Sequence, residues 1–445
     1  MNGLKQLWTS LHESLWFVPG VMVLAAIVTA VGLIELDIAY KHKWLDTFPR
    51  IFGAGAEGSR GMLTAIAGSM ITVAGLAFSL TIVAMSQVAG QYSSRVLRNF
   101  MRDRWNQFVL GSFVGIFAYC LIVLRTVRGG DEQEFVPSLA VFFGLVLAVG
   151  SIAVLIFFIH HIASSIQAST IIANAAAETT AAIHKLFPED MGDEVAAAAD
   201  APEIVEDFDA RTDVPSPKTG FVQAVDQDQL LEAAEKYRCV IRMEHGVGDF
   251  VVRGAPIASA TSRLDDAALK KIGETFTIGR YRTIDQDAAF GIRQIVDIAL
   301  KALSPGINDV TTAAVCVDYL GSILVELADR RIESPVRKDK GGDVRVIARG
   351  ETFKSLTDEA FDQIRDAAKN KPEIYLRLLD AIETAAGRAR SNARLAVLEK
   401  HLSLIDEAAT QTLESDYNRG RVRLKISAVQ RKIAGDKIAA HGKLV

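Results

Sequence analysis

The chain has 445 residues, of which 50% are hydrophobic and 23% are charged, and its formal net charge is −4. The apolar residues gather in the first 170 residues, and the remainder has the composition of a globular protein. The mild net charge excludes the general affinity for nucleic acid that a strongly basic chain has. The three cysteines, Cys120, Cys239 and Cys316, stand far apart, which excludes a disulfide framework or a zinc ribbon.

Four apolar segments are each long enough to cross a bilayer, whose hydrocarbon core of about 30 Å needs about 20 helical residues. They run over about residues 15–38, 62–88, 108–127 and 136–159, and none carries a charged residue near its centre. Four buried helices of a water-soluble protein are the alternative. The long uncharged runs favour an α-helical membrane protein with four transmembrane helices and a cytoplasmic α+β C-terminal region.

The second span carries small and hydroxylated residues at steps of three, four and seven, which place them on one helix face. This face consists of Ala65, Gly68, Thr72, Gly75, Ser79 and Ser86. Small residues let helix backbones approach closely, so the face is typical of a helix–helix seam. The alternative is a pore lining in which the hydroxyl groups face water. Both hold if the seam surrounds the central axis of an oligomer.

The loop after the second span is basic and contains a single opposing acid, Asp103. Its basic residues are Arg95, Arg98, Arg102 and Arg104. Because Lys and Arg in short loops favour the cytoplasmic side, the loop predicts that both termini are cytoplasmic. The loop after the first span opposes this orientation, since it also holds basic residues: Lys41, Lys43, Arg50 and Arg60. The arginines either contact lipid headgroups or form a vestibule that attracts anions.

Two histidines, His160 and His161, stand where the fourth span meets the membrane interface. They are either pH-sensitive residues that titrate near neutral pH or polar tips at the interface. With its helical extension, which Pro188 ends, the transmembrane domain covers residues 1–187. An acidic linker at 188–217 follows.

A small β module is predicted at 218–262, and a mainly helical cytoplasmic domain at 263–445. Asp285, Asp287, Asn308 and Asp309 could be imagined as a cation site, although helix capping and turn chemistry explain the last two. One apolar pattern near the C-terminus predicts either an intramolecular helical hairpin or an oligomerisation seam. It comprises Leu395, Leu398, Leu402, Ile405, Ala409 and Leu413.

The sequence contains no phosphate-binding loop, no dinucleotide fingerprint, no nucleophile elbow and no H-E-x-x-H motif. We therefore predict no catalytic residues, no cofactor, no metal and no enzyme activity. The basic stretch at 333–350 lacks the interleaved aromatic residues of a nucleic-acid site, so no nucleic acid is expected as a partner.

Three stretches together resemble the bacterial membrane family called domain of unknown function 2254. They are AFSLTIVAMS at 77–86, SRVLRNFMRD at 94–103 and DIALKALSPGIND at 297–309. The resemblance covers nearly the whole chain and implies a multi-pass protein of the bacterial inner membrane. It implies no known activity and no catalytic residues.

We therefore expect a homo-oligomer that forms or gates an ion-permeation pathway, with the lipid bilayer, other copies of the chain and ions as partners. The absence of ionisable residues from the span centres disfavours coupled transport. The alternative is a membrane-anchored scaffold or sensor whose cytoplasmic domain recruits a partner.

Overall fold

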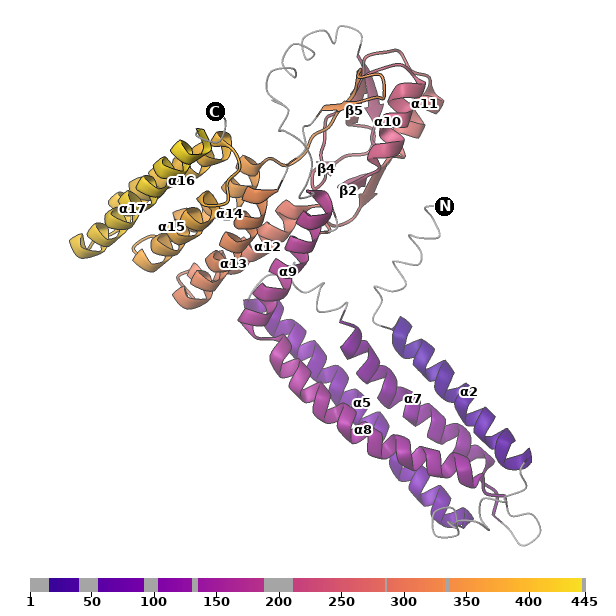
Figure 1. Cartoon of the computed structure of the whole chain (residues 1–445). Helices are drawn as coiled ribbons and strands as arrows, with labels where there is room; N and C mark the ends of the chain where they lie inside the picture. The colour runs from indigo at the N-terminus through magenta and orange to yellow at the C-terminus, as the bar shows by residue number, and fades with distance from the viewer. Residues whose placement is uncertain are drawn as a thin grey trace. The chain divides into compact units, whose positions relative to one another are not determined.

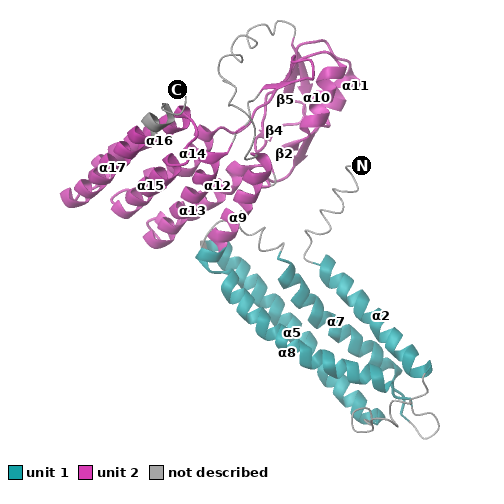
Figure 2. Ribbon diagram, viewed as in Figure 1, with its two compact units in different colours: residues 1–170 teal, residues 171–445 magenta. Residues whose placement is uncertain are grey.

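A computed structural model describes residues 16–39, 55–91, 103–129, 135–187, 211–284, 286–330, 332 and 336–441. The chain divides into two compact units, residues 1–170 and 171–445, shown in different colours in Figure 2. The two units divide at residue 170, whereas we predicted that the transmembrane domain extends to residue 187. Most of the acidic segment at 188–217 lies outside the described residues.

The N-terminal unit contains four long apolar helices (Figure 1). They are α2 (Phe17–Ala39), α5 (Ala56–Gln91), α7 (Arg104–Thr126) and α8 (Ser138–Ser165). α7 packs against the other three helices. In the most apolar 18-residue stretch of α7, half of the residues are buried. The corresponding share is 17% in α2 and α8 and 28% in α5. α7 is therefore the central helix of this unit, and the other three turn most of their apolar surface outward.

Among the described residues, five helices, rather than the four predicted spans, are long and apolar enough to cross a membrane. The fifth is α13 (Val310–Asp329), in the C-terminal unit. The mean hydropathy of α13 is 1.5, against 2.0 to 2.8 for the other four helices. Half of the residues in its most apolar stretch are buried. It packs against α12 (Ala288–Leu303) and α15 (Pro372–Ala386). Length and hydropathy alone do not separate a buried core helix from a span, which is why the two counts differ.

The C-terminal unit contains further long helices. They are α9 (Ala168–Leu186), α14 (Phe353–Ala367), α16 (Asn392–Thr412) and α17 (Asp416–His441). We predicted one continuous helix from the fourth span to Leu186, but the helix is interrupted at Ile166 and Gln167. α9 then packs on α12, where a Cβ atom at Gly291 would clash with Thr179. The apolar stripe of α16 is buried within the chain, so it serves an intramolecular interface.

The strands form two sheets over a common core. Their bounds are β1 (Thr212–Pro215), β2 (Gly220–Val225), β3 (Ile241–Met243), β4 (Phe250–Val251), β5 (Pro256–Ala260), β6 (Phe276–Gly279), β7 (Val336–Lys338) and β8 (Val344–Ile347). The larger sheet has the order β1-β5-β3-β8-β7, and the smaller one β4-β2-β6. Apart from the parallel pair β3–β8, all neighbours are antiparallel. Helices α10 (Gln227–Lys236) and α11 (Asp266–Gly273) contribute Leu230 and Ile272 to the core.

These strands extend beyond the β module predicted at 218–262. β6 lies after α11, and the β7–β8 hairpin lies within the range that we predicted to be mainly helical. The hairpin joins the sheet because Ile241 of β3 pairs with Val346 of β8, two residues far apart in sequence. Local periodicity carries no information about such a pairing.

A buried carboxylate joins two helices of the N-terminal unit. Asp37 of α2 has no exposed surface. It accepts hydrogen bonds from the backbone amides of Leu139, at 3.0 Å, and Ala140, at 3.2 Å. These amides belong to the first turn of α8, which begins after Pro137 and has no side-chain cap of its own. The carboxylate thus satisfies amides that the helix leaves unpaired and faces the positive end of its dipole.

We predict that Asp37→Ala destabilises the N-terminal unit by roughly 2 kcal/mol, because the first-turn amides of α8 lose their charged acceptor. Thermal unfolding of the full chain in detergent measures the effect as a lower midpoint. The matched control is Glu35→Ala, since Glu35 is an exposed acid two residues away on α2. Equal midpoints for the two variants would contradict the capping role.

Candidate functional site

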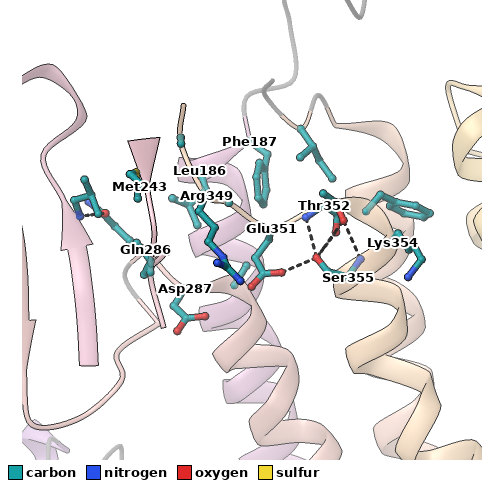
Figure 3. A pocket seen from close by; sticks show the side chains of 18 of the residues that line it. Leu186, Phe187, Met243, Gln286, Asp287, Arg349, Glu351, Thr352, Lys354 and Ser355 are labelled. Carbon is teal, nitrogen blue, oxygen red and sulfur yellow. Dashed lines mark hydrogen bonds between the residues drawn. The ribbon is translucent and has the colours of Figure 1, made fainter. Parts of the chain in front are cut away.

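The C-terminal unit contains a cavity of about 810 Å³ (Figure 3). Its wall is formed by the end of α9, the segment that follows β3, and the turns that begin several helices. The cavity has the size of small-molecule sites in proteins. The polar or charged residues that line it include Asp249, Gln286, Asp287, Arg337, Arg349, Glu351, Thr352, Lys354, Ser355 and Arg394.

Four helices begin at the wall of this cavity. They contribute Gln227 of α10, Ala288 of α12, Phe353 of α14 and Ala393 of α16. Each helix is preceded by a capping residue whose side chain accepts a first-turn amide: Asp226, Asp287, Thr352 and Ser391. Helix N-termini carry partial positive charge, and the lining adds four basic side chains to it. Three acidic residues, Asp249, Asp287 and Glu351, also line the cavity. The basic side chains and helix N-termini suit an anionic group of a ligand, and the carboxylates suit a cationic or hydrogen-bonding group.

Asp287, which lines the cavity, forms an ion pair with the partly buried Arg282. Arg282 donates from Nε to Asp287 Oδ2 at 2.8 Å and from Nη2 to Oδ1 at 2.9 Å. Asp287, whose side chain is 2% exposed, also caps α12 by accepting the amide of Phe290. Burial lowers the pKa of Arg282, but the hydrogen bond and charge of Asp287 outweigh it and raise that pKa. Gly248, at φ +94°, lies so close that a Cβ atom would be 2.7 Å from Asp287 Oδ2.

Glu351 is the titratable residue of the cavity with the most unusual environment. It accepts a hydrogen bond from Ser355 Oγ at 2.6 Å. Burial raises its pKa, and the nearby carboxylates of Asp287 and Glu359 add to this effect. The Ser355 hydrogen bond and the charge of Arg282 oppose the shift without cancelling it. A raised pKa makes it easier for the Glu351 carboxyl group to take up a proton, and titratable groups with shifted pKa values are candidates for contact with a ligand.

All six residues of the small-residue face of α5 are exposed: Ala65, Gly68, Thr72, Gly75, Ser79 and Ser86. A Cβ atom at Gly68 or Gly75 would meet nothing within 4 Å. The opposite face, with Leu63, Ala67 and Ala74, packs into the unit. The structure thus brings the predicted residues onto one face, and none of the other described helices packs closely over that face. Thr72 Oγ1 donates to the carbonyl of Gly68 at 2.8 Å.

The other predicted residues are dispersed. Arg95, Arg98 and Arg102 lie outside the described residues, and Arg104 is exposed at the start of α7. His160 is exposed, whereas His161 Nε2 lies 2.5 Å from Asp103 Oδ2. Asp103 also caps α7 through the amide of Trp105. The His161–Asp103 contact therefore links the end of α8 to the beginning of α7.

Two members of the imagined cation site have other roles. Asp287 and Asp309 are helix caps, and Asp285 lies outside the described residues. A different group has the residue types and spacing for a metal: the ligand atoms of Asp358, Asp362 and His401 lie within 4.8 Å of one another. Both carboxylates already pair with cations, Asp358 with Lys354 and Asp362 with Arg365. The charges of this group are balanced as it stands.

Sequence reasoning missed Asp37, Arg282 and Glu351. In the sequence, Asp37 is a charged residue near the end of a span, and the neighbouring residues do not indicate that its side chain contacts another helix. Arg282 and Glu351 are ordinary charged residues until long-range folding buries them. The available signal was Asp287 before an apolar helix, since Asp is a preferred N-cap.

The fold defines a helical membrane protein with several apolar helices and a C-terminal unit that contains both helices and strands. The chain belongs to the family described as Predicted membrane protein (DUF2254), whose model matches residues 12–384. It is 32% identical over 437 residues to the uncharacterized protein Rv1290c of Mycobacterium tuberculosis and to the uncharacterized protein Mb1321c of Mycobacterium bovis. Each match covers 95% of this chain and 81% of the relative. No solved structure matches the chain.

We predict that Glu351→Gln raises the stability of the C-terminal unit near pH 8 and leaves it nearly unchanged near pH 4. The folded state holds the pKa of Glu351 above its unfolded value, so the stability of the native protein falls as pH rises through the folded pKa. Glutamine mimics the protonated form and escapes this loss. Thermal unfolding across this pH range measures the difference, and equal shifts at both ends would contradict it.

Proposed function

We propose that α2, α5, α7 and α8 span a bacterial inner membrane and that both termini lie in the cytoplasm. The arginines around the start of α7 support this orientation. We place α13 in the water-exposed C-terminal unit, because its hydropathy is lower and its neighbours α12 and α15 are amphipathic helices of that unit. Residues 171–445 are then a cytoplasmic unit.

We further propose that the protein is a homo-oligomer whose copies meet along the small-residue face of α5 and form or gate an ion pathway there. The observation that carries this proposal is the exposure of all six residues of the face. In hydrocarbon, association depends on close backbone packing rather than on water-driven burial. Gly68 and Gly75 leave room for another helix.

The same face suits a polar pathway better than the other outward faces do. α2 and α8 turn large apolar residues outward, among them Leu24, Val28, Val149 and Ile156. The α5 face offers hydroxyl groups at Thr72, Ser79 and Ser86, beside the exposed apolar side chains of Leu76 and Val83. Copies arranged around this face would place three rings of hydroxyl groups along a common axis, without a fixed charge among them.

We expect the double variant Gly68→Leu, Gly75→Leu to dissociate the oligomer in detergent, because leucine side chains hold the helices apart. Light scattering after size-exclusion chromatography measures the mass. The matched control is Gly32→Leu, Gly150→Leu, which changes two outward glycines of α2 and α8 that also have open space. If both variants keep the wild-type mass, α5 is not the interface.

Ion flux through liposomes that contain the purified protein tests the pathway itself. We expect flux in the wild type, and a fall to background when Thr72, Ser79 and Ser86 are replaced by valine or alanine, because the polar lining is lost. If the wild-type protein is oligomeric but passes no ions, the proposed ion pathway is wrong, while the proposed interface along α5 still stands.

A second candidate function is that of a membrane-anchored sensor, and the cavity of the C-terminal unit favours it. We expect an anionic metabolite from a screening panel, with inorganic phosphate and nucleotides included, to raise the unfolding midpoint of the full chain. Arg349→Gln should weaken the shift, since Arg349 lines the cavity with an exposed side chain. Lys270→Gln on α11 is the control. A panel without any shift would count against the sensor.

A further inference from the structure

The smaller sheet, β4-β2-β6, gathers aromatic and basic residues at one end. In its register, Phe221 of β2 faces Phe250 of β4 on one side and Gly279 of β6 on the other. Because both neighbours are antiparallel to β2, the segment before β2 lies beside the segments that follow β4 and β6. The amide of Arg253 accordingly donates to Thr219 Oγ1 at 3.0 Å. We call this the aromatic–basic patch; it comprises Lys218, Phe221, Phe250, Val252, Arg253, Arg280 and Tyr281.

The apolar members of the patch are unusually exposed. Phe250 is 55% exposed, Val252 54% and Tyr281 52%. The rings of Phe250 and Phe221 meet edge to face with centroids 5.1 Å apart. The backbone near Tyr281 is held by Gln223 Nε2, which donates to its carbonyl at 2.6 Å. The patch is thus an ordered surface that presents large apolar groups to solvent.

The inner face of the same sheet is fully occupied. Val222, Val251 and Ile278 are buried in the core together with Leu230 of α10. Residues alternate between the two faces of a strand, so Phe221 and Phe250 are fixed on the outer face. The outward position of the rings follows from the register and requires no rearrangement.

The patch carries positive charge, and no described carboxylate forms an ion pair with Lys218, Arg253 or Arg280. The neighbouring Asp249 faces His245 and Arg349. The segments 217–221, 250–253 and 279–282 contain four basic residues and no acid. Arg282 is bound by Asp287, whereas Lys218, Arg253 and Arg280 are exposed. Arg280 lies over the Tyr281 ring, 6.0 Å from its centroid. Aromatic rings surrounded by basic side chains are the composition of surfaces that lie at a lipid–water interface.

We propose that the aromatic–basic patch binds the anionic surface of a lipid bilayer. Phe250, Val252 and Tyr281 enter the headgroup region, and Lys218, Arg253 and Arg280 contact lipid phosphates and other anionic headgroup oxygens. Each basic side chain strengthens such binding about fivefold. The apolar helices of the same chain keep the patch near a bilayer, so even weak contact is populated. The inference requires membrane insertion of this family member but not the ion pathway.

The test uses the full-length chain in lipid nanodiscs, with an environment-sensitive fluorophore attached at Phe250→Cys. The three native cysteines are buried, so the new thiol is the accessible one among the described residues. We expect a blue shift and quenching by spin-labelled lipid when the discs contain phosphatidylglycerol, and neither in pure phosphatidylcholine. The reference site is Glu232→Cys, exposed on α10, which covers the other face of the sheet.

Two charge variants complete the design. Lys218→Gln, Arg253→Gln, Arg280→Gln should lose more than about half of the quenching, since each lost charge weakens binding. Lys236→Gln, Lys270→Gln, Lys271→Gln removes the same charge from exposed positions of α10 and α11 and should retain it. Tyr281→Cys provides a second reporter in case the first fails to fold.

The outcomes separate the possible partners. Quenching that is equal in both lipids, or equal for the two charge variants, would overturn recognition of anionic headgroups. A reporter that stays unquenched in every disc would overturn the proposal outright, whether the patch instead binds an acidic protein or nothing.

Discussion

A helix in hydrocarbon has no water to satisfy its polar groups, so each buried donor and acceptor of the N-terminal unit needs a partner within the chain. Asp37 meets this requirement for the first turn of α8, which Pro137 leaves without a side-chain cap. Tyr119 of α7 adds a hydrogen bond to the carbonyl of Ala140 at 2.6 Å. Contacts from α2 and α7 therefore converge on one end of α8. These hydrogen bonds connect α2 and α7 to the start of α8.

In the C-terminal unit, too, a carboxylate caps the first turn of a helix, and there it also contributes to the candidate site. Asp287 caps α12 and holds Arg282 at once, so a single carboxylate fixes both a helix end and a wall of the cavity. Because three other helices also begin at that wall, their partial charges act on the same space. Glu351 lies within this field, beside other carboxylates, and keeps its proton more readily than an exposed acid. The residues that cap these helices therefore also determine the electrostatics of the candidate site.

The sequence predicted what depends on local pattern and missed what depends on distant pairing. Hydropathy located α2, α5, α7 and α8 within a few residues, and spacing alone placed Gly68 and Thr72 on one face of α5. It was ambiguous for α13, because a buried core helix and a short span have similar composition. Local pattern also had no means to foresee the pairing of β3 with β8. Asp37 and Glu351 acquire their roles only through residues far away in sequence.

The β3–β8 pair also determines how the chain is made. Ile241 bonds to a strand that contains Val346, and α12 and α13 lie between them in sequence. During synthesis, β3 remains without this neighbour until roughly a hundred more residues have left the ribosome. Its edge is open throughout that interval, when an unpaired strand is most prone to join another chain. A chain truncated before β8 would leave this edge of β3 without its partner strand.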